Sequence, residues 1–224
     1  MARFNRIEVF LKMQETGIIP VFYHSDIELC KAVVKACYAG GVRVFEFTNR
    51  DDFALEVFSE LNKFAIKHFP DMILGIGTIL DAGTTAMYIQ AGANFVVSPI
   101  MNPDMAKVCN RKKVLWIGGC ETLTEISQAE ELGAEIVKIF PGEMFRPSFI
   151  KALKAPMPWT NVMVTGGVSP TKESIEEWFN AGVSCVGMGS QLFPKEVLKE
   201  KNFDYIEEKV KTAIQIVREW RNNS

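Results

Sequence analysis

The chain has 224 residues, of which 48% are hydrophobic and 23% are charged, a composition typical of a globular protein with a sizeable core. Its formal net charge is −2, so neither a general nucleic-acid-binding surface nor a membrane-binding surface is indicated. No apolar run is long enough to cross a bilayer, and residues 1–6 lack the apolar core of a signal peptide, so we expect a cytoplasmic protein.

A lead-in helix is predicted over residues 5–15, where apolar side chains recur at helical spacing. Short apolar strands and helices then alternate. The predicted strands cover residues 18–23, 42–48, 72–78, 95–98, 114–117, 135–141, 161–165 and 185–188. The helices between them are expected to start near Ser25, Asp51, Asp81, Asn102, Thr122, Pro147 and Ser169, and a long final helix covers residues 205–220.

Several of these helices end in the same way, with a glycine that leads directly into the next strand, at positions 40–41, 92, 133 and 182. Strict alternation of strand and helix implies a parallel sheet covered by helices. About eight such units are present, so we predict a (β/α)8 TIM barrel that forms one domain over residues 1–224. The alternative is a doubly wound open sheet, but Tyr23-His24-Ser25 stands where its glycine-rich fingerprint would be.

The cysteine and histidine content favours neither a disulfide framework nor a metal centre. The five cysteines are odd in number, contain no Cys-x-x-Cys pair, and are accompanied by only two histidines. Reduced cysteines that pack in the core are therefore expected, and no metal is expected.

The second predicted strand carries a row of polar side chains on one face. Glu46, Thr48 and Arg50 alternate with Phe45 and Phe47, so the polar row is expected to point into the barrel and the rings toward the helices. Inward polar groups are costly unless they pair or bind something. The row therefore indicates either a binding site or a buried structural pair of Glu46 with Arg50.

A lysine stands in the middle of the strand predicted at residues 135–141. An ammonium group on an apolar strand loses its hydration, so the pKa of Lys138 is expected to fall. A neutral lysine amine in a pocket attacks carbonyls and forms a Schiff base. The alternative is a side chain that extends outward to water. Two inward charges across one barrel favour a site, in which Glu46 moves protons while Arg50 and Thr78 hold a carboxylate.

Glycines also follow the last two predicted strands. Gly166-Gly167 and Gly189-Ser190 stand where barrels of this type bind phosphate through backbone N–H groups. Glycine spacing alone is equally compatible with tight turns that bind nothing.

Four segments are distinctive when they are taken together. They read Val-Phe-Glu-Phe-Thr-Asn-Arg at 44–50, Gly-Ile-Gly-Thr at 75–78, Val-Lys-Ile-Phe-Pro-Gly-Glu at 137–143 and Thr-Gly-Gly-Val-Ser-Pro at 165–170. In this order they resemble the family of 2-keto-3-deoxy-6-phosphogluconate (KDPG) and 4-hydroxy-2-oxoglutarate (KHG) aldolases, from about Gly17 to about Pro194. The resemblance implies a class I aldolase on a TIM barrel, usually a homotrimer, with no metal and no other cofactor.

The resemblance also implies a role for each matching residue. Lys138 is implied to form the Schiff base and Glu46 to act as general acid and base. Arg50 and Thr78 are implied to hold the pyruvyl carboxylate, with Phe140 beside the imine. The implied phosphate-binding residues are Gly166, Gly167 and Ser190, and Gly189 joins them through its place in the same turn.

The implied reaction is cleavage of KDPG to pyruvate and glyceraldehyde 3-phosphate, of KHG to pyruvate and glyoxylate, or of both. The expected partner is thus a small 2-keto acid, phosphorylated in the first case. Glu121, Phe145 and Arg146 depart from the usual pattern near the pocket mouth. Glu121 is expected to influence the choice of aldehyde, and Phe145 and Arg146 are expected to cover the pocket, where Arg146 could contribute to phosphate binding. The alternatives are a phosphosugar isomerase or epimerase on the same barrel, which needs no imine, and a non-catalytic descendant that binds sugar acids.

Overall fold

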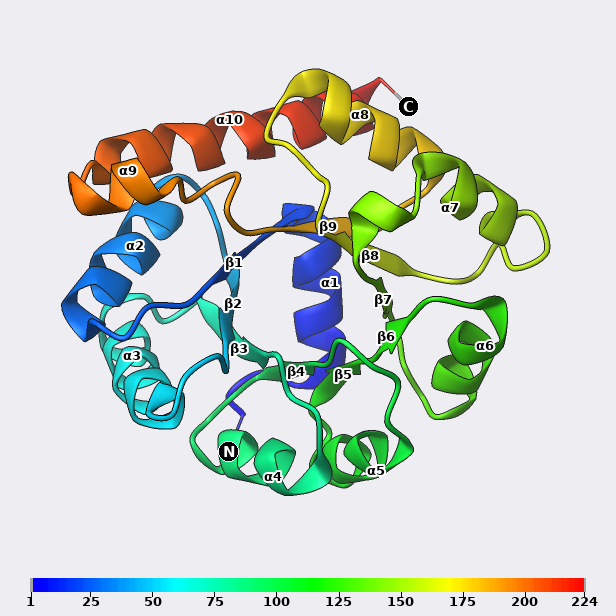
Figure 1. Cartoon of the computed structure of the whole chain (residues 1–224), viewed down its shortest axis with the longest axis horizontal. Coiled ribbons are helices and arrows are strands. Elements are labelled where there is room, and N and C mark those ends of the chain that lie inside the picture. The colour runs from blue at the N-terminus through cyan, green and yellow to red at the C-terminus, as the bar shows by residue number, and fades with distance from the viewer. Residues whose placement is uncertain (1, 224) are drawn as a thin grey trace.

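The computed structural model describes residues 2–223 of the chain. Parallel strands form a ring at the centre of the molecule (Figure 1). The strands are β1 (Ile18–Phe22), β2 (Val44–Thr48), β3 (Ile73–Gly77), β4 (Phe95–Val97), β5 (Leu115–Ile117), β6 (Gly119–Cys120), β7 (Val137–Ile139), β8 (Val162–Thr165) and β9 (Cys185–Met188). Their order is β5-β4-β3-β2-β1-β9-β8-β7-β6. Since β5 and β6 follow each other across Gly118, they act as one interrupted strand that closes the ring, and the predicted (β/α)8 barrel is confirmed.

The helices surround this ring, apart from α1, which lies across its centre (Figure 1). They are α1 (Arg6–Thr16), α2 (Ile27–Ala39), α3 (Ala54–His68), α4 (Ala82–Gln90), α5 (Pro103–Lys112), α6 (Leu123–Glu131), α7 (Pro147–Lys154), α8 (Lys172–Ala181), α9 (Lys195–Lys199), α10 (Phe203–Asn222) and the short 3-10 helix η1 (Gly142–Met144). Gly41, Gly92, Gly133 and Gly182 adopt positive φ angles at helix ends, which confirms the predicted stop signals. Among residues 2–223, no helix is both long and apolar enough to cross a membrane.

Three helix starts differ from the prediction. The N-cap of α2 is Asp26 rather than Ser25, because the Asp26 carboxylate accepts from the backbone N–H groups of Glu28 and Leu29. In the same way Thr171, rather than Ser169, caps α8, and α3 starts at Ala54 after a turn that begins at Asp51. The short helix α9 was not predicted, since its five residues show no apolar period.

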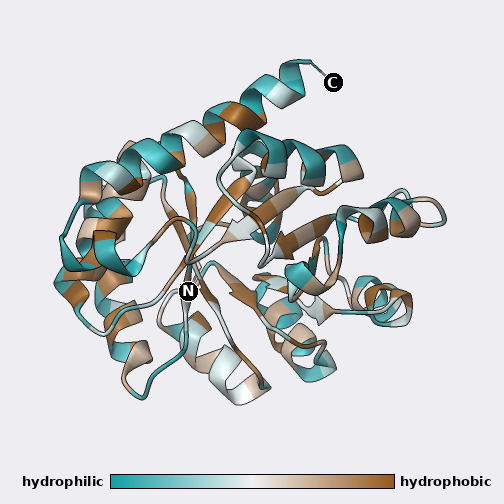
Figure 2. Ribbon diagram, turned by 45° about the horizontal axis from the view of Figure 1, so that its top comes forward, coloured by the Kyte–Doolittle hydropathy of each residue, from teal (hydrophilic) through white to brown (hydrophobic). Residues whose placement is uncertain are grey.

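The hydrophobic core has two layers, one inside the ring and one between the ring and the helices. Figure 2 shows the hydrophobic residues gathered on the central strands. The outer layer includes Phe45 and Phe47 and the sides of the helices that face the strands. All five cysteines are buried, which agrees with their predicted packing role.

The inner layer is completed by the first helix. Val9 and Met13 of α1 are fully buried and pack against Val44, Ile73 and other inward side chains of the strands. Asn5 and Glu8 form a capping box at the start of α1. The helix therefore closes the end of the barrel at which the strands begin, and the opposite end holds the functional side chains.

Candidate active site

The inward face of β2 carries the polar row expected from its alternation. Glu46 and Thr48 are each 1% exposed, whereas Phe45 and Phe47 are fully buried on the helix side of the strand. Val44, two residues before Glu46, packs in the inner core. The predicted division of faces is confirmed, and β2 brings a carboxyl group into the barrel.

The inward face of β7 brings an amine to the same interior. Ile136 belongs to the inner core, and Val137 and Ile139 to the outer one, so Lys138 points inward. Its side chain is 5% exposed, and its Nζ atom lies 4.7 Å from the centroid of the Phe140 ring. Burial lowers the pKa of Lys138; Glu46 opposes this change and Arg50 adds to it. Burial therefore shifts the amine toward its neutral form.

The buried carboxyl group of Glu46 has no hydrogen-bond partner among residues 2–223. Burial raises the pKa of Glu46, and the charges of Lys138 and Arg50 partly offset that rise. Each group thus senses the charge of the other, although no ion pair within 4.0 Å joins these two described residues. A carboxyl group and an amine that both shift toward their neutral forms are suited to exchanging protons with a bound molecule.

Gly77 on β3 makes room for this carboxyl group. Phe47 pairs with Ile76 and Thr48 with Gly77 across the two strands, and a Cβ atom on Gly77 would lie 1.8 Å from Glu46 Oε1. No larger residue fits there without moving Glu46. No role of its own was predicted for Gly77, although a glycine on the strand next to an inward acid was a signal for one.

A cavity of about 510 Å³ opens at the end of the barrel above these two groups. Six of the residues singled out from the sequence line it, namely Arg50, Phe140, Gly166, Gly167, Gly189 and Ser190. Lys138 and Glu46 are not among the lining residues and lie deeper along their strands. The structure thus brings an arginine, an aromatic ring and two glycine turns to one opening.

Thr78 follows β3 directly and has a φ angle of 63°. A left-handed conformation is uncommon for a β-branched residue and is often found at functional sites. Thr78 is not among the residues that line the 510 Å³ cavity. The position of Thr78 at the end of the strand beside β2 is therefore consistent with a role next to Glu46 and Thr48.

Six of the lining residues were not predicted from the sequence, among them Thr165 and Glu143. Thr165 at the end of β8 lines the cavity, and its buried hydroxyl has no partner among residues 2–223. Glu143 in η1 also lines it, with its carboxylate against the turn at Gly166. Thr165 could have been predicted, because it carries a hydroxyl group at the end of a strand. No local feature of the sequence indicated that Glu143 would line the cavity.

The residues thought to modify the pocket mouth lie elsewhere. Glu121 is exposed and does not line the cavity; its backbone N–H donates to Glu125 Oε2. Phe145 packs against Phe149, with ring centroids 4.9 Å apart, and the exposed Arg146 is the N-cap residue of α7. The expectation that Phe145 and Arg146 cover the pocket is thus wrong, because η1 presents Glu143 to it instead.

The glycine turns give a prediction about stability. Gly167 has a φ angle of 69°, and a Cβ atom there would lie 2.9 Å from the Glu143 backbone. Gly167→Ala is expected to lower the free energy of unfolding by about 1–2 kcal/mol or more. Gly189→Ala is the matched control, since its Cβ would make an ordinary 3.4 Å contact with Val21 O. Urea denaturation of the two variants measures the difference, and equal stabilities would contradict the predicted strain.

Comparisons with known proteins show similarity to aldolases over nearly the whole chain. The family model described as "Aldolase: KDPG and KHG aldolase" matches residues 9–209. A 2-dehydro-3-deoxy-phosphogluconate aldolase of Pseudoalteromonas atlantica is 33% identical over 198 residues, which cover 88% of this chain and 89% of the relative. A KHG/KDPG aldolase of Escherichia coli strain K12 is 30% identical over 201 residues, covering 88% and 91% respectively.

A solved structure extends the similarity to three dimensions. The KDPG aldolase of Legionella pneumophila, crystallised with pyruvate captured at low pH as a covalent carbinolamine intermediate, has a TM-score of 0.81 and 26% identity. The match covers 92% of this chain and 97% of that one. A carbinolamine is the adduct that an amine and a ketone form on the way to a Schiff base.

Proposed function

The chain belongs to the family of KDPG and KHG aldolases, and on this premise we propose that it cleaves KDPG, KHG or both, with Lys138 as the Schiff-base residue. It is a lyase of the class I aldolase type. The observation that carries the assignment of Lys138 is its burial inside the barrel, where the pKa of the amine is lowered and the carboxyl group of Glu46 lies within electrostatic reach.

The first step in this proposal is attack of the Lys138 amine on the C2 ketone of the substrate. The lone pair of Nζ forms a C–N bond, and loss of water from the carbinolamine gives an iminium ion. The lowered pKa of Lys138 makes the neutral amine more available for this attack. The iminium then accepts the electron pair of the C3–C4 bond as that bond breaks, and an enamine of pyruvate remains.

Glu46 is proposed to move the protons of this reaction. It takes the proton of the C4 hydroxyl, through a water molecule, while the C3–C4 bond breaks and the aldehyde forms. A positive charge at Lys138 lowers the pKa of Glu46, so forming the iminium favours the ionised, basic carboxylate at the step that needs a base. The protonated acid can then return a proton to the enamine carbon before hydrolysis releases pyruvate.

The remaining residues are proposed to position the substrate. The guanidinium of Arg50 lines the cavity and suits a bidentate contact with the pyruvyl carboxylate, which Thr78 would support. Phe140 lies beside the amine and shields the imine from water. The turns at Gly166-Gly167 and Gly189-Ser190 line the cavity, and their backbone N–H groups can bind a terminal phosphate. Such positioning keeps the ketone within reach of the amine.

A substrate panel tests the proposal directly. We expect pyruvate release from KDPG, KHG or both, measured by a coupled lactate dehydrogenase assay. If the glycine turns bind a terminal phosphate, kcat/KM should be about 10-fold or more higher for KDPG than for its dephosphorylated counterpart. The reason is that a hydrogen bond to a charged group contributes about 1.5–3 kcal/mol to binding. Absence of pyruvate from every 2-keto-3-deoxy acid of the panel would reject the proposed substrates.

We further propose that the protein is cytoplasmic and forms a homotrimer, as the resemblance of its motifs to the family implies. Several large apolar side chains are exposed and available for subunit contacts, among them Phe53, Met87, Ile100 and Trp159. Sedimentation equilibrium tests the assembly, and a single species at the mass of one chain would exclude the trimer.

A further inference from the structure

A second hollow opens at the other end of the barrel, where the strands begin. Its volume is about 540 Å³, and its lining comes from the end of α1, the residues just before β2 and β3, and the last turns of α10. Lys138, Glu46 and the glycine turns lie toward the opposite ends of the strands, so this hollow is separate from the candidate active site.

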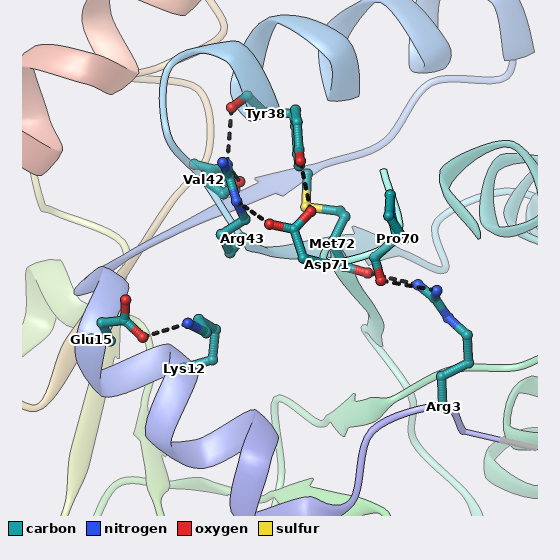
Figure 3. Close-up of polar contacts among 9 residues, drawn as sticks. All are labelled: Arg3, Lys12, Glu15, Tyr38, Val42, Arg43, Pro70, Asp71 and Met72. Carbon is teal, nitrogen blue, oxygen red and sulfur yellow. Dashed lines mark hydrogen bonds and ion pairs between the residues drawn. The ribbon is translucent and has the colours of Figure 1, made fainter. Parts of the chain in front are cut away.

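Positive charge exceeds negative charge in the lining of this hollow. The charged lining residues are Lys12, Glu15, Arg43, Asp71, Arg218 and Arg221. Lys12 pairs with Glu15 and Arg43 pairs with Asp71 (Figure 3). Neither guanidinium group of α10 forms an ion pair within 4.0 Å with a carboxylate of the lining, although Arg221 interacts electrostatically with Glu15. Because the whole chain has a net charge of −2, this excess of positive charge is a local property.

Arg43 is held in place by a set of contacts that leaves part of its guanidinium unused. Its Nε donates to Asp71 Oδ2 at 2.7 Å, and its Nη1 donates to the carbonyl oxygens of Tyr38 and Val42 at 3.0 and 2.8 Å (Figure 3). The Tyr38 ring lies 4.0 Å below the guanidinium, and the Tyr38 hydroxyl donates to Asp71. The N–H groups of Nη2 have no partner among residues 2–223. A fixed guanidinium with free donors is preorganised for an anion.

The two arginines of α10 add charge from the facing side. Arg221 donates to the carbonyl oxygens of Gln14 and Glu15, which caps the end of α1 and fixes α10 against it. Arg218 lies three residues earlier on the same face of the helix, is exposed, and has no hydrogen bond or ion pair with any residue in the described range 2–223. Its donors are free to contact a molecule in the hollow.

We propose that this hollow binds a phosphate monoester, that is, a small molecule carrying a dianionic phosphate group. Four basic and two acidic side chains line the hollow, and this excess of two positive charges matches the charge of about −2 that such a phosphate carries near pH 7. Guanidinium forks bind phosphate oxygens bidentately. The size of the hollow suits a small molecule, and the acidic character of the chain outside it disfavours a polyanion such as a nucleic acid.

Calorimetric titration with inorganic phosphate and, separately, with glycerol 1-phosphate at constant ionic strength tests this site. Arg218→Ala is expected to weaken both affinities about 10-fold to 100-fold, since one charged hydrogen-bonding partner is lost. The control is Arg111→Ala, because Arg111 is an exposed arginine of α5 outside the hollow; it should keep the wild-type affinity. Hydrogen exchange with saturating phosphate should show protection of residues 41–43 and 214–222.

Several outcomes would overturn the inference. They are absence of binding by both probes, an Arg218→Ala variant with wild-type affinity, and protection confined to residues 165–167 and 187–191 at the candidate active site. Binding of inorganic phosphate with exclusion of the monoester would overturn the ligand class. None of these measurements depends on aldolase activity, so the experiments test the phosphate site separately from the proposed reaction.

Discussion

Lys138→Arg is expected to abolish aldol cleavage. The substitution keeps a positive charge and a similar length, but an arginine guanidinium stays protonated and cannot attack a ketone. Loss of a covalent nucleophile lowers kcat by about 10⁴-fold or more. A phosphosugar isomerase on the same barrel would need no imine and would keep its turnover, so the variant separates the two reaction classes.

Reductive trapping measures the covalent step itself. Incubation with pyruvate and borohydride should add one reduced pyruvyl group to the wild-type chain, and peptide mapping should place it on Lys138. Lys154→Arg is the matched control: Lys154 is another partly buried lysine with a pKa lowered by burial, but it lies on α7 and donates to the carbonyl of Thr160. Trapping on another lysine, or none at all, would refute the role of Lys138.

Glu46→Gln is expected to lower kcat by about 10²-fold to 10⁴-fold, the usual contribution of a general acid and base. The amide has nearly the same shape and should leave the imine chemistry of Lys138 possible. Borohydride trapping with pyruvate should therefore persist while turnover is lost. A variant with normal turnover would show that Glu46 is only a buried structural residue.

The same variant should be more thermostable than the wild type at neutral pH. The folded-state pKa of Glu46 is raised above its ordinary value of 4.5. Between pH 4.5 and the folded pKa the unfolded chain releases this proton while the folded chain keeps it, so the wild type loses stability as pH rises. Below pH 4.5 the acid is protonated in both the folded and the unfolded state, and the advantage of Gln disappears. Melting temperatures measured from pH 4 to pH 8 test this, and a gain confined to the acid side would contradict it.

Patterns of short range in the sequence predicted the barrel and its inward charges. The alternation of Glu46 with Phe45 and Phe47 fixed the faces of β2, because side chains of a strand have a period of two. The glycines after the helices marked their ends for a similarly local reason. Asp26 and Ser25 are both good N-cap residues, so the sequence alone did not distinguish them. In the structure Asp26 is the N-cap, because its carboxylate accepts hydrogen bonds from two backbone N–H groups.

Features that depend on distant segments were not predicted. The proximity of Glu143 to Gly166 depends on how η1 packs against the turn after β8, and the room that Gly77 leaves for Glu46 depends on the register of β2 with β3. The hollow at the start of the strands brings together Arg43 and Arg218, which are far apart in the sequence. These distances cannot be predicted from a single sequence, because they depend on how the barrel closes.

The helix that closes one mouth of the barrel has a consequence for the kinetics. Because α1 fills the end where the strands begin, substrate must enter and products must leave through the opening at the opposite end of the barrel. The pyruvyl group, bonded to Lys138, would sit farther in than the aldehyde. The aldehyde must then depart before hydrolysis frees pyruvate, which is an ordered release that product-inhibition patterns would distinguish from a random one.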